Sequence, residues 1–495
     1  MAIWGISALS HDASITVVEG NEILFAGHSE RYSKKKNDKY LNYEIIREAN
    51  HYGAPEKIIW FERPVVKRLR QVLSGEWGEV KKAFPKEYLR GCGLETTPIE
   101  YVDHHHSHAA GGYFTSGFQR ASILVVDAIG EFVTTSIWRA EGSDLKKVFT
   151  QSYPHSIGLF YSAITHRVGL KPNEEEFILM GMAAYGSPRF YDEILRDLIK
   201  ISDAPNFELK RNLHLGCMDW LTDKIVTEQD QFDLAASAQK VVEDYMLLTA
   251  QWIATNLPSR NLVIAGGVAL NCVANEKIAS LTESGRKLFS NIWIMPNPGD
   301  AGSSLGAVAA YSQQQLNWRH PYLGTDINRP FDIDGILSTL NTDKIAAIAN
   351  GRAEFGPRAL GNRSLIADPR GASIKDQVND IKKRQRFRPF APMVLEEFAH
   401  DVFELPVKSS PYMQFTAKCK YPNEFPAICH FDGSSRVQTV SRQDNENVHT
   451  LIKEFYDRTG CPMLLNTSLN IKGQPLVNDW NDALAFSSKY GVKAF

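Results

Sequence analysis

The chain has 495 residues, too many for one hydrophobic core, so we expect two or three domains. Lys and Arg total 55 against 57 Asp and Glu, and the net charge of -2 argues against a global basic field for nucleic acid or anionic lipid. The six cysteines form no C-x-x-C pair, which argues against zinc ribbons and disulfide frameworks and favours a cytoplasmic protein with reduced thiols. The amino terminus leads directly into a strand, and no stretch approaches the length of a membrane span, so we expect no membrane partner.

A strand–turn–strand–turn–strand pattern occurs twice along the chain. Its apolar, β-branched strands are expected at residues 3–6, 15–18 and 23–26, and again at 123–126, 133–138 and 145–149. The first turn carries His11 and Asp12, which could act as a general base with its carboxylate partner or could simply order the turn. Two copies of such a unit predict a duplicated α/β architecture with paired turns facing a cleft, where phosphates usually bind.

A run of histidines lies between the two copies. On a helix, His104 and His108 are four residues apart and share a face, so both imidazoles can bind one ion, while His105 and His106 point elsewhere. Asp127 follows the strand at 123–126 and could complete a mixed nitrogen and oxygen ligand set, which suits Fe(II), Mn or Zn. A solvated or core-bonded histidine cluster would show the same spacing.

Two later strands end in turns that suit nucleotide binding. After residues 262–265, the pair Gly266–Gly267 lets backbone N–H groups approach a phosphate closely. After residues 292–295, a Pro/Gly turn places Asp300 at the carboxyl end of a strand, where α/β proteins bind ligands. Tight turns without a ligand would contain the same glycines. The sequence has neither a Walker A lysine motif nor G-x-G-x-x-G.

Residues 316–333 carry little hydrophobic periodicity and several Pro, Gly, Asn and Asp, so we expect a boundary here and assign domains to 1–335 and 336–495. In the second domain, arginines stand beside Gly, Pro and aromatic residues at 351–364, 381–390 and 435–439. Charge held in such rigid loops is typical of a site that clamps a small dianion such as a phosphate ester. A solvated basic surface or an RNA-binding stripe is the alternative.

In this order, the motifs resemble those of the O-carbamoyltransferases of the nodulation-factor and antibiotic-tailoring type. The resemblance runs from Ser10-His11-Asp12 to Asn466–Asn470 and covers nearly the whole chain. It implies a duplicated actin-like (ASKHA) ATPase domain, related to the tRNA threonylcarbamoyl transferases, followed by a YrdC-like α/β domain. Two positions depart from the family pattern, because Ile178 stands in place of a lysine and Ala128 in place of a glycine.

The resemblance also implies which residues form each site. An iron-like divalent metal, in contact with the nucleotide phosphates, would be bound by His104, His108, Asp127 and Asp300. ATP, entering with Mg, would be surrounded by Gly130, Glu131, Gly266, Gly267 and Asn271. The carbamoyl phosphate site would contain the family's Lys-x-Arg and Ser-x-Asn residues with nearby arginines, namely Arg358, Arg363, Lys382, Arg384, Arg388, Arg436, Ser468 and Asn470.

The reaction implied is ATP-dependent O-carbamoyl transfer. Carbamoyl phosphate would lose phosphate, the carbamate would attack the α-phosphate of ATP, and the resulting carbamoyl adenylate would pass along a shielded path to an acceptor hydroxyl. Sugars, other natural products and 5-hydroxymethylcytosine in viral DNA all remain candidate acceptors. The Lys34–Lys36 run could contact a DNA backbone or be a solvated loop.

Other functions fit parts of the sequence. A tRNA threonylcarbamoyl-type enzyme shares both domain types, but the Gly-Pro-Arg-Ala-Leu-Gly stretch at 356–361 favours the O-carbamoyl branch. An actin-like sugar kinase or ATPase would need neither the paired histidines nor the arginine-rich second domain. A non-enzymatic binding module leaves the combination of metal, nucleotide and anion motifs unexplained. A homodimer is compatible with the resemblance.

Overall fold

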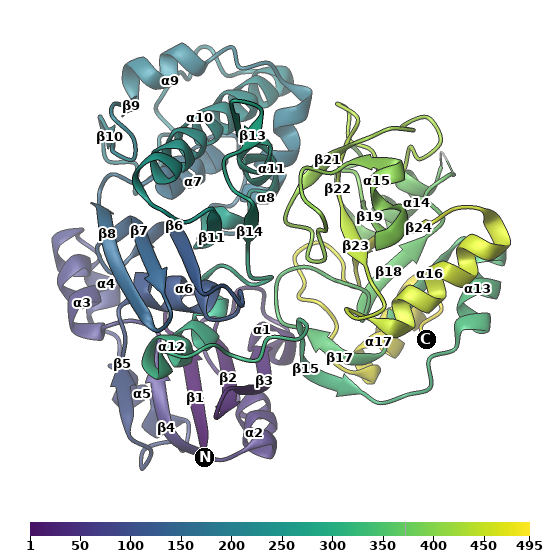
Figure 1. The fold of residues 1–495 in the computed structure, drawn as a ribbon, viewed down its shortest axis with the longest axis horizontal. Coiled ribbons are helices and arrows are strands. Elements are labelled where there is room, and N and C mark those ends of the chain that lie inside the picture. Colours follow the sequence, from purple (N-terminus) through teal and green to yellow (C-terminus); the bar gives the residue numbers. More distant parts are fainter. Residues whose placement is uncertain (372) are drawn as a thin grey trace. The chain divides into compact units, whose positions relative to one another are not determined.

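The computed structural model describes residues 1–371 and 373–495, which form two compact units (Figure 1). Unit 1 comprises Met1–Ser10, Thr16–Ile23 and Gly53–Trp318, and unit 2 comprises His11–Ile15, Leu24–Tyr52 and Arg319–Phe495. The division after Trp318 falls inside the stretch of weak periodicity at 316–333. The assignment of separate functions to 1–335 and 336–495 stays a prediction.

Two five-stranded sheets have the same strand order, β3-β2-β1-β4-β5 and β8-β7-β6-β11-β14. The strands of the first are β1 (Ala2–Ser7), β2 (Ser14–Glu19), β3 (Glu22–His28), β4 (Pro55–Trp60) and β5 (Ile99–Tyr101). Those of the second are β6 (Arg120–Gly130), β7 (Val133–Glu141), β8 (Asp144–Ser152), β11 (Asn261–Ala265) and β14 (Asn291–Trp293). In both sheets the last two strands run parallel to the central one. This repetition confirms the duplicated α/β fold.

Two helices of unit 1 approach each other unusually closely. A Cβ on Gly306 of α12 (Ser303–Ser312) would lie 2.1 Å from the Ser107 carbonyl oxygen of α6 (His104–Tyr113). Likewise, a Cβ on Gly5 of β1 would lie 1.7 Å from the Ser304 carbonyl oxygen. Glycine at these positions therefore allows α6, α12 and β1 to pack backbone to backbone, which fixes where the histidine-bearing helix begins.

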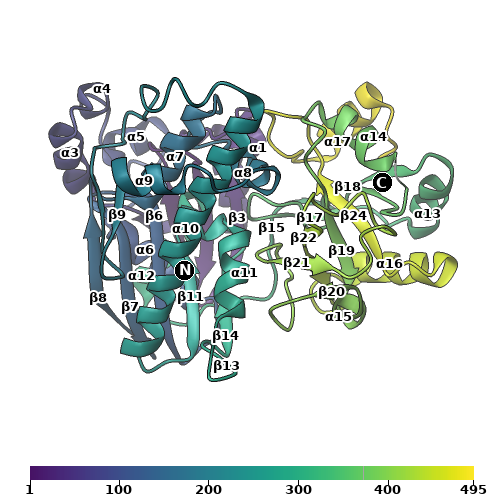
Figure 2. The same ribbon diagram turned by 90° about the horizontal axis from the view of Figure 1, so that it is seen from above.

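The remaining helices of unit 1 surround the sheets. The longest, α10 (Glu228–Asn256), packs against α7 (Ile157–Arg167), α8 (Glu176–Met182) and α11 (Cys272–Ser280), as Figure 2 shows. The others are α3 (Pro64–Leu73), α4 (Trp77–Val80), α5 (Pro85–Gly91) and α9 (Tyr191–Asp197), with short strands β9 (Ile199–Ile201), β10 (Phe207–Leu209), β12 (Thr282–Glu283) and β13 (Arg286–Lys287). Ile178, where the family pattern has a lysine, is buried in α8. It acts as a core residue.

Unit 2 is built on a mixed sheet of order β16-β18-β24-β19-β23. Its strands are β16 (Ile345–Ala349), β18 (Arg363–Ala367), β24 (Met463–Ser468), β19 (Ala391–Leu395) and β23 (Gln438–Val440). Smaller sheets contain β15 (Tyr322–Ile327) with β17 (Gly351–Glu354), and β20 (Phe403–Glu404) with β21 (Thr416–Cys419) and β22 (Ser434–Arg436). The helices are α1 (Glu30–Ser33), α2 (Tyr43–Tyr52), α13 (Ile333–Thr342), α14 (Ile374–Lys382), α15 (Ala399–Val402), α16 (Glu446–Thr459) and α17 (Trp480–Tyr490).

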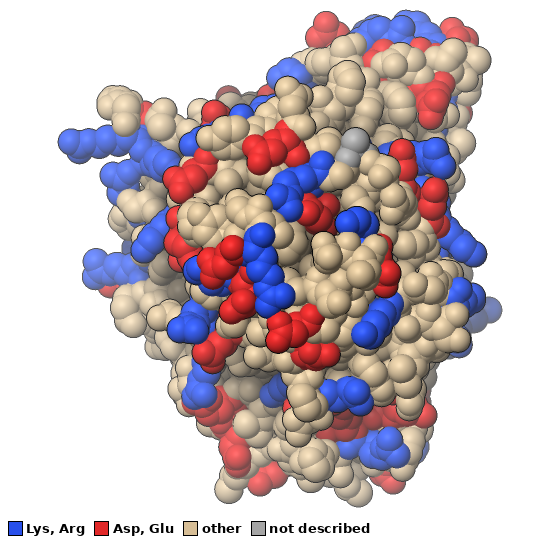
Figure 3. Space-filling model, turned by 90° about the vertical axis from the view of Figure 1, so that its right-hand side faces the viewer, with Lys and Arg blue, Asp and Glu red and all other residues tan. Residues whose placement is uncertain are grey.

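The surface in Figure 3 carries positive and negative side chains interspersed with uncharged ones. This distribution agrees with the near-neutral net charge and gives that face no extended field of one sign. Among the described residues, none of the helices combines the length and apolarity that a membrane crossing requires.

Candidate functional site

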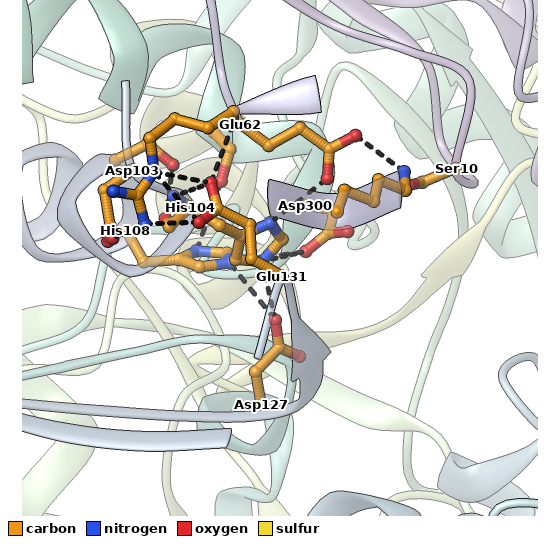
Figure 4. Close-up of polar contacts among 12 residues, drawn as sticks. Ser10, Glu62, Asp103, His104, His108, Asp127, Glu131 and Asp300 are labelled. Carbon is orange, nitrogen blue, oxygen red and sulfur yellow. Dashed lines mark hydrogen bonds and ion pairs between the residues drawn. The ribbon is translucent and has the colours of Figure 1, made fainter. Parts of the chain in front are cut away.

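Two histidines and two aspartates of unit 1 converge in a buried cluster (Figure 4). Nε2 of His104 lies 3.1 Å from Nε2 of His108 and 3.1 Å from Oδ2 of Asp127. Nε2 of His108 lies 3.3 Å from Oδ2 of Asp127 and 3.3 Å from Oδ1 of Asp300, which in turn lies 3.4 Å from Nε2 of His104. The four side chains are those that the sequence nominated as ligands of one ion.

These distances suit a divalent cation at the centre of the cluster. Ligand bonds of about 2.0–2.2 Å to imidazole nitrogen and carboxylate oxygen place neighbouring ligand atoms about 3.0–3.5 Å apart in tetrahedral or octahedral geometry. Five interatomic distances of the cluster fall between 3.1 and 3.4 Å, and all four ligand atoms lie within 4.8 Å of one another. The mixed nitrogen and oxygen donors fit Fe(II), Mn or Zn.

The local backbone structure orients each ligand side chain toward the cluster. Asp103 caps the start of α6 by accepting a hydrogen bond of 2.9 Å from the His106 N–H, which begins the helix with its histidine face inward. Asp127 lies where the register of β6 against β7 shifts between Val126 and Gly130, and such an irregularity redirects a side chain out of the sheet. Asp300 begins a short 3-10 turn at the start of α12.

The other two histidines of the run have different partners. Nδ1 of His105 lies 2.8 Å from the Ser136 hydroxyl, and burial lowers the pKa of His105 to about 3. The ring of His106 stacks on Trp138 with centroids 5.4 Å apart. The core-bonded interpretation thus applies to His105 and the convergent one to His104 and His108, while His106 is partly exposed.

Burial and nearby charges shift the pKa values of the cluster residues in opposite directions. Burial disfavours a charged His104, but the carboxylates of Asp300 and Asp127 outweigh it and raise the His104 pKa well above the usual range. Burial alone would raise the Asp127 pKa, yet His104 and His108 hold it well below its usual range. The cluster therefore favours ionised carboxylates with positive charge between them, which a divalent cation supplies more strongly than protons do.

The turn at Gly130–Glu131 is built around His104. A Cβ on Gly130 would lie 2.1 Å from Cδ2 of His104, so only glycine allows the imidazole to pack there. The Glu131 carboxylate is buried and accepts hydrogen bonds from the backbone N–H groups of Arg63 at 2.7 Å and His104 at 3.3 Å. It also pairs with the Arg63 guanidinium at 2.5 Å. The Glu131 side chain, which is expected near ATP, thus stabilises the start of α6.

The paired glycines lie directly beside the cluster. Gly266 has φ +88°, and a Cβ there would lie 2.2 Å from the Val126 carbonyl oxygen, so the position requires glycine. The Gly267 N–H donates to Oδ1 of Asp127 at 3.3 Å. Because one carboxylate contacts both the ligand cluster and the glycine turn, a phosphate bound at the turn would be next to the ion.

Asn271 has a structural role in addition to its expected place near ATP. Its side-chain oxygen caps α11 by accepting from the Ala274 N–H at 3.1 Å, and its amide donates to Gln239 at 3.0 Å. Gln239 in turn donates to Glu243 at 2.9 Å. The amide of Asn271 therefore belongs to a buried polar network along α10.

In unit 2, Lys382 is buried among the residues that the Lys-x-Arg and Ser-x-Asn pattern nominated. Its ammonium donates to the Ser468 hydroxyl at 3.1 Å and to Oδ1 and the carbonyl oxygen of Asn470 at 2.9 Å each, and it also contacts the Ser468 carbonyl. Burial and the positive charges of Arg384 and Arg388 hold the Lys382 pKa well below its usual range.

Arg384 extends this positive region. Its guanidinium donates to Oδ1 of Asn379 at 2.6 Å and to the Pro389 carbonyl at 3.1 Å, and it stacks on Phe390 at 4.0 Å. Burial, then Arg388 and Arg436, lower its pKa well below the usual range. We refer to Lys382, Arg384, Arg388 and Arg436 as the cation cluster. The hydrogen bonds of Lys382 and Arg384 go to neutral groups, so an anion would relieve the repulsion.

Arg363 does not share this environment. It is fully buried and donates to the backbone carbonyls of Thr325, Asn350, Gly351, Asn362 and Asn478 at 2.8–3.1 Å. These hydrogen bonds join β15, β17 and the start of α17, and the expected contact of Arg363 with carbamoyl phosphate stays a prediction. Arg358 is partly exposed in the loop before β18.

His11 and Asp12 form a pair in unit 2, with Nδ1 of His11 3.0 Å from Oδ2 of Asp12. Asp12 has φ +53°, and although burial opposes it, His11 lowers the Asp12 pKa. Half of the His11 side chain is exposed. An ionised Asp12 beside an accessible imidazole is an arrangement that serves a general base.

Sequence reasoning missed Glu62, which lies beside His104 in Figure 4, and Arg63 and Lys67, which pair with Glu131 and Glu62. The signal was present, since Glu62 and Arg63 follow the apolar run Ile58–Phe61 at the carboxyl end of a strand.

Comparison with known families gives two matches. The family model described as carbamoyltransferase N-terminus matches residues 78–309, and the one described as carbamoyltransferase C-terminus matches residues 337–495. Relatives include nodulation protein U of Rhizobium fredii, 38% identical over 94% of this chain and 89% of its own length. Nodulation protein NolNO of Sinorhizobium fredii is 31% identical over 96% of this chain and 76% of its own length. An uncharacterized protein of Synechocystis is 33% identical over 97% and 93%.

Solved structures resemble the chain more distantly. The activator of 2-hydroxyisocaproyl-CoA dehydratase from Clostridium difficile, with bound ADPNP, is 12% identical and covers 63% of this chain and 94% of its own, with a TM-score of 0.37. HypF of T. kodakarensis is 13% identical and covers 64% and 48%, with a TM-score of 0.34.

Proposed function

The chain belongs to the carbamoyltransferase family and is a carbamoyl-transferring enzyme, and on that premise we propose that it carbamoylates an acceptor hydroxyl through carbamoyl adenylate. Carbamoyl phosphate is the donor and ATP the co-substrate in this proposal. The observation that carries it is the coexistence of a buried ligand cluster beside a glycine turn in unit 1 and a cation cluster around the buried Lys382 in unit 2.

Carbamoyl phosphate fits the cation cluster by charge. Burial and neighbouring arginines lower the pKa of Lys382 and of Arg384, and both side chains donate to neutral partners, so a dianion offsets an existing electrostatic cost. The planar guanidinium of Arg384, fixed by Asn379 and Phe390, suits the forked recognition of a phosphate. In the proposal, Lys382, Ser468 and Asn470 bind the carbamoyl end.

ATP and an iron-like cation fit the ligand cluster and the glycine turn. We assign His104, His108, Asp127 and Asp300 as the residues that hold the ion, which when bound would act as a Lewis acid toward phosphate oxygens. The turn at Gly266 and Gly267 would lie beside the nucleotide phosphates, because the Gly267 N–H donates to Asp127, one of the residues that would hold the ion. Gly130 contributes through its contact with His104.

The proposed reaction has two stages. Hydrolysis of carbamoyl phosphate releases phosphate, and a carbamate oxygen attacks the α-phosphorus of ATP, which expels pyrophosphate and forms the mixed anhydride. The acceptor oxygen then attacks the carbamoyl carbon, AMP departs, and the hydroxyl proton passes to His11 as general base. The ionised Asp12, 3.0 Å away, orients the imidazole and stabilises it when protonated.

We propose a hydroxyl of a sugar or another natural product as acceptor, which the net charge of -2 favours over a nucleic acid. The test is mass spectrometry after incubation with carbamoyl phosphate, ATP, divalent iron and a panel of hydroxyl compounds that includes 5-hydroxymethylcytosine DNA. A gain of one carbamoyl group on a small molecule supports the proposal. Modification of the DNA alone would reassign the acceptor, and no carbamoylation of any panel member would contradict the proposed acceptor class.

A further inference from the structure

The far side of the His104 ring faces a buried carboxylate that the proposed reaction does not use. Nε2 of His104 points into the ligand cluster, while Nδ1 lies 3.8 Å from Oε2 of Glu62. Glu62 follows β4, and both side chains are at most 5% exposed. This Nδ1 is buried and has no hydrogen-bond partner among the described residues.

The carboxylate of Glu62 is itself anchored. Its Oε1 accepts a hydrogen bond from Lys67 in α3 at 2.6 Å, and the same ammonium contacts the hydroxyl of Ser10 (Figure 4). Lys67 therefore compensates the buried charge of Glu62 on one side and leaves Oε2 directed toward His104. The Oε2 atom of Glu62 can accept a hydrogen bond in this position only if a donor faces it.

A metal-ligating imidazole meets this condition. A histidine that binds a cation through Nε2 must carry its remaining proton on Nδ1, and a buried N–H without an acceptor costs free energy. A carboxylate acceptor also makes the imidazole a stronger ligand. Closing the separation from 3.8 Å to the about 2.8 Å of a charge-assisted hydrogen bond requires only a small side-chain adjustment.

The two histidine ligands differ in this respect. Nδ1 of His108 lies 3.3 Å from the hydroxyl of Ser303, a neutral partner, whereas Nδ1 of His104 faces a charged one. Arg63, the residue after Glu62, acts on the same ligand from the other side, because it fixes Glu131, which accepts from the His104 backbone N–H. One strand end thus supports both the ring and the backbone of His104.

We propose that Glu62 is a positioning residue that fixes the Nδ1–H tautomer of His104 and strengthens its binding to the cation, with Lys67 and Ser10 holding the carboxylate in place. This inference rests on the proposed metal site. A carboxylate that merely stabilises the corner between β4 and α3 would leave cation affinity and the tautomer of His104 unchanged.

The test measures Zn(II) affinity of the full chain by competition with a chromophoric chelator, for the parent, Glu62→Gln, Glu62→Asp and the control Glu79→Gln. Glu79 lies in α4 and pairs with Lys82. Its substitution therefore removes a carboxylate that contacts neither His104 nor His108. We expect about 10–100-fold weaker binding for Glu62→Gln, a smaller loss for Glu62→Asp, which keeps the charge, and no change for Glu79→Gln.

A second readout is the tautomer itself. Long-range ¹H–¹⁵N correlation spectra of the zinc-loaded parent should show His104 protonated at Nδ1, and Glu62→Gln should shift the Nδ1 resonance. Parent-like affinity and spectra in both folded Glu62 variants, with binding lost in His104→Ala, would overturn the role of Glu62 and leave the metal site standing. Failure of the parent to bind Zn(II) or Fe(II) would overturn the metal site itself and this inference with it.

Discussion

The ligand cluster and the cation cluster handle buried charge in opposite ways. In the first, two carboxylates face two imidazoles, so the charges compensate one another even before a cation binds. In the second, burial and neighbouring arginines lower the pKa of Lys382 and of Arg384, whose hydrogen bonds go to neutral groups. A site whose charges are already paired can be rigid. A site whose charges are unpaired gains more electrostatic stabilisation when its ligand binds.

The ligand cluster should respond most strongly to loss of one imidazole. Replacing His104 by Ala removes a nitrogen ligand and the contact that Gly130 was shaped to accommodate, so we expect loss of stoichiometric metal and of carbamoyl transfer together. Elemental analysis of the purified variant checks this, with Ala in place of the partly exposed His106 as the control. Unchanged metal content in His104→Ala would rule out the assignment.

Arg363 and Arg384 are both expected at the carbamoyl phosphate site, but their substitution should have different effects. Arg363→Ala leaves five backbone carbonyls without their buried donor, so we expect the free energy of unfolding to fall by about 3–5 kcal/mol, measured by urea denaturation. Addition of phosphate should not restore the free energy of unfolding that this variant loses. A stable Arg363→Ala variant with weakened phosphate binding would instead restore Arg363 to the anion site.

Arg384→Ala should weaken carbamoyl phosphate binding by about 10–100-fold, since a charged hydrogen-bond donor is worth about 1.5–3 kcal/mol. Because its removal also relieves repulsion from Arg388 and Arg436, unfolding should not become easier. ATP affinity, measured by calorimetry, should stay close to the parent value. An equal loss of ATP affinity would contradict a division of labour between the two clusters.

The smallest effect is expected at Asn271. Its substitution by Ala removes the cap of α11 and two hydrogen bonds with Gln239, for a destabilisation of about 1–2 kcal/mol. Thermal unfolding with and without ATP separates the two roles of this residue. If the amide also contacts ATP, the ligand-induced stabilisation falls as well, and if it is only structural, that stabilisation is retained.

The sequence predicts the parts of this molecule that depend on short-range pattern. Alternating apolar residues in two copies predict the duplicated sheets, and the four-residue spacing of His104 and His108 places them on one helix face. Asp127 and Asp300 could be nominated because both follow strands, and the Lys382, Ser468 and Asn470 contacts follow the family pattern.

What the sequence does not predict depends on long-range burial. Arg363 stands in a Gly-Asn-Arg-Ser context that resembles an anion-binding loop, and only its five carbonyl partners reveal a structural role. Glu62 is an ordinary acidic residue until folding brings it beside His104. The assignment of residues 11–15 and 24–52 to unit 2 likewise arises from contacts that lie far apart in the chain.

The position at which ATP is cut tests the central claim most directly. A carbamate attacking the α-phosphorus gives AMP and pyrophosphate, whereas an actin-like kinase or ATPase transfers or releases the γ-phosphate and gives ADP. We therefore predict AMP and pyrophosphate, formed only when carbamoyl phosphate is present and with one AMP per carbamoylated hydroxyl, in assays that resolve nucleotides chromatographically. ADP as the nucleotide product, together with normal acceptor carbamoylation, would contradict the carbamoyl adenylate mechanism.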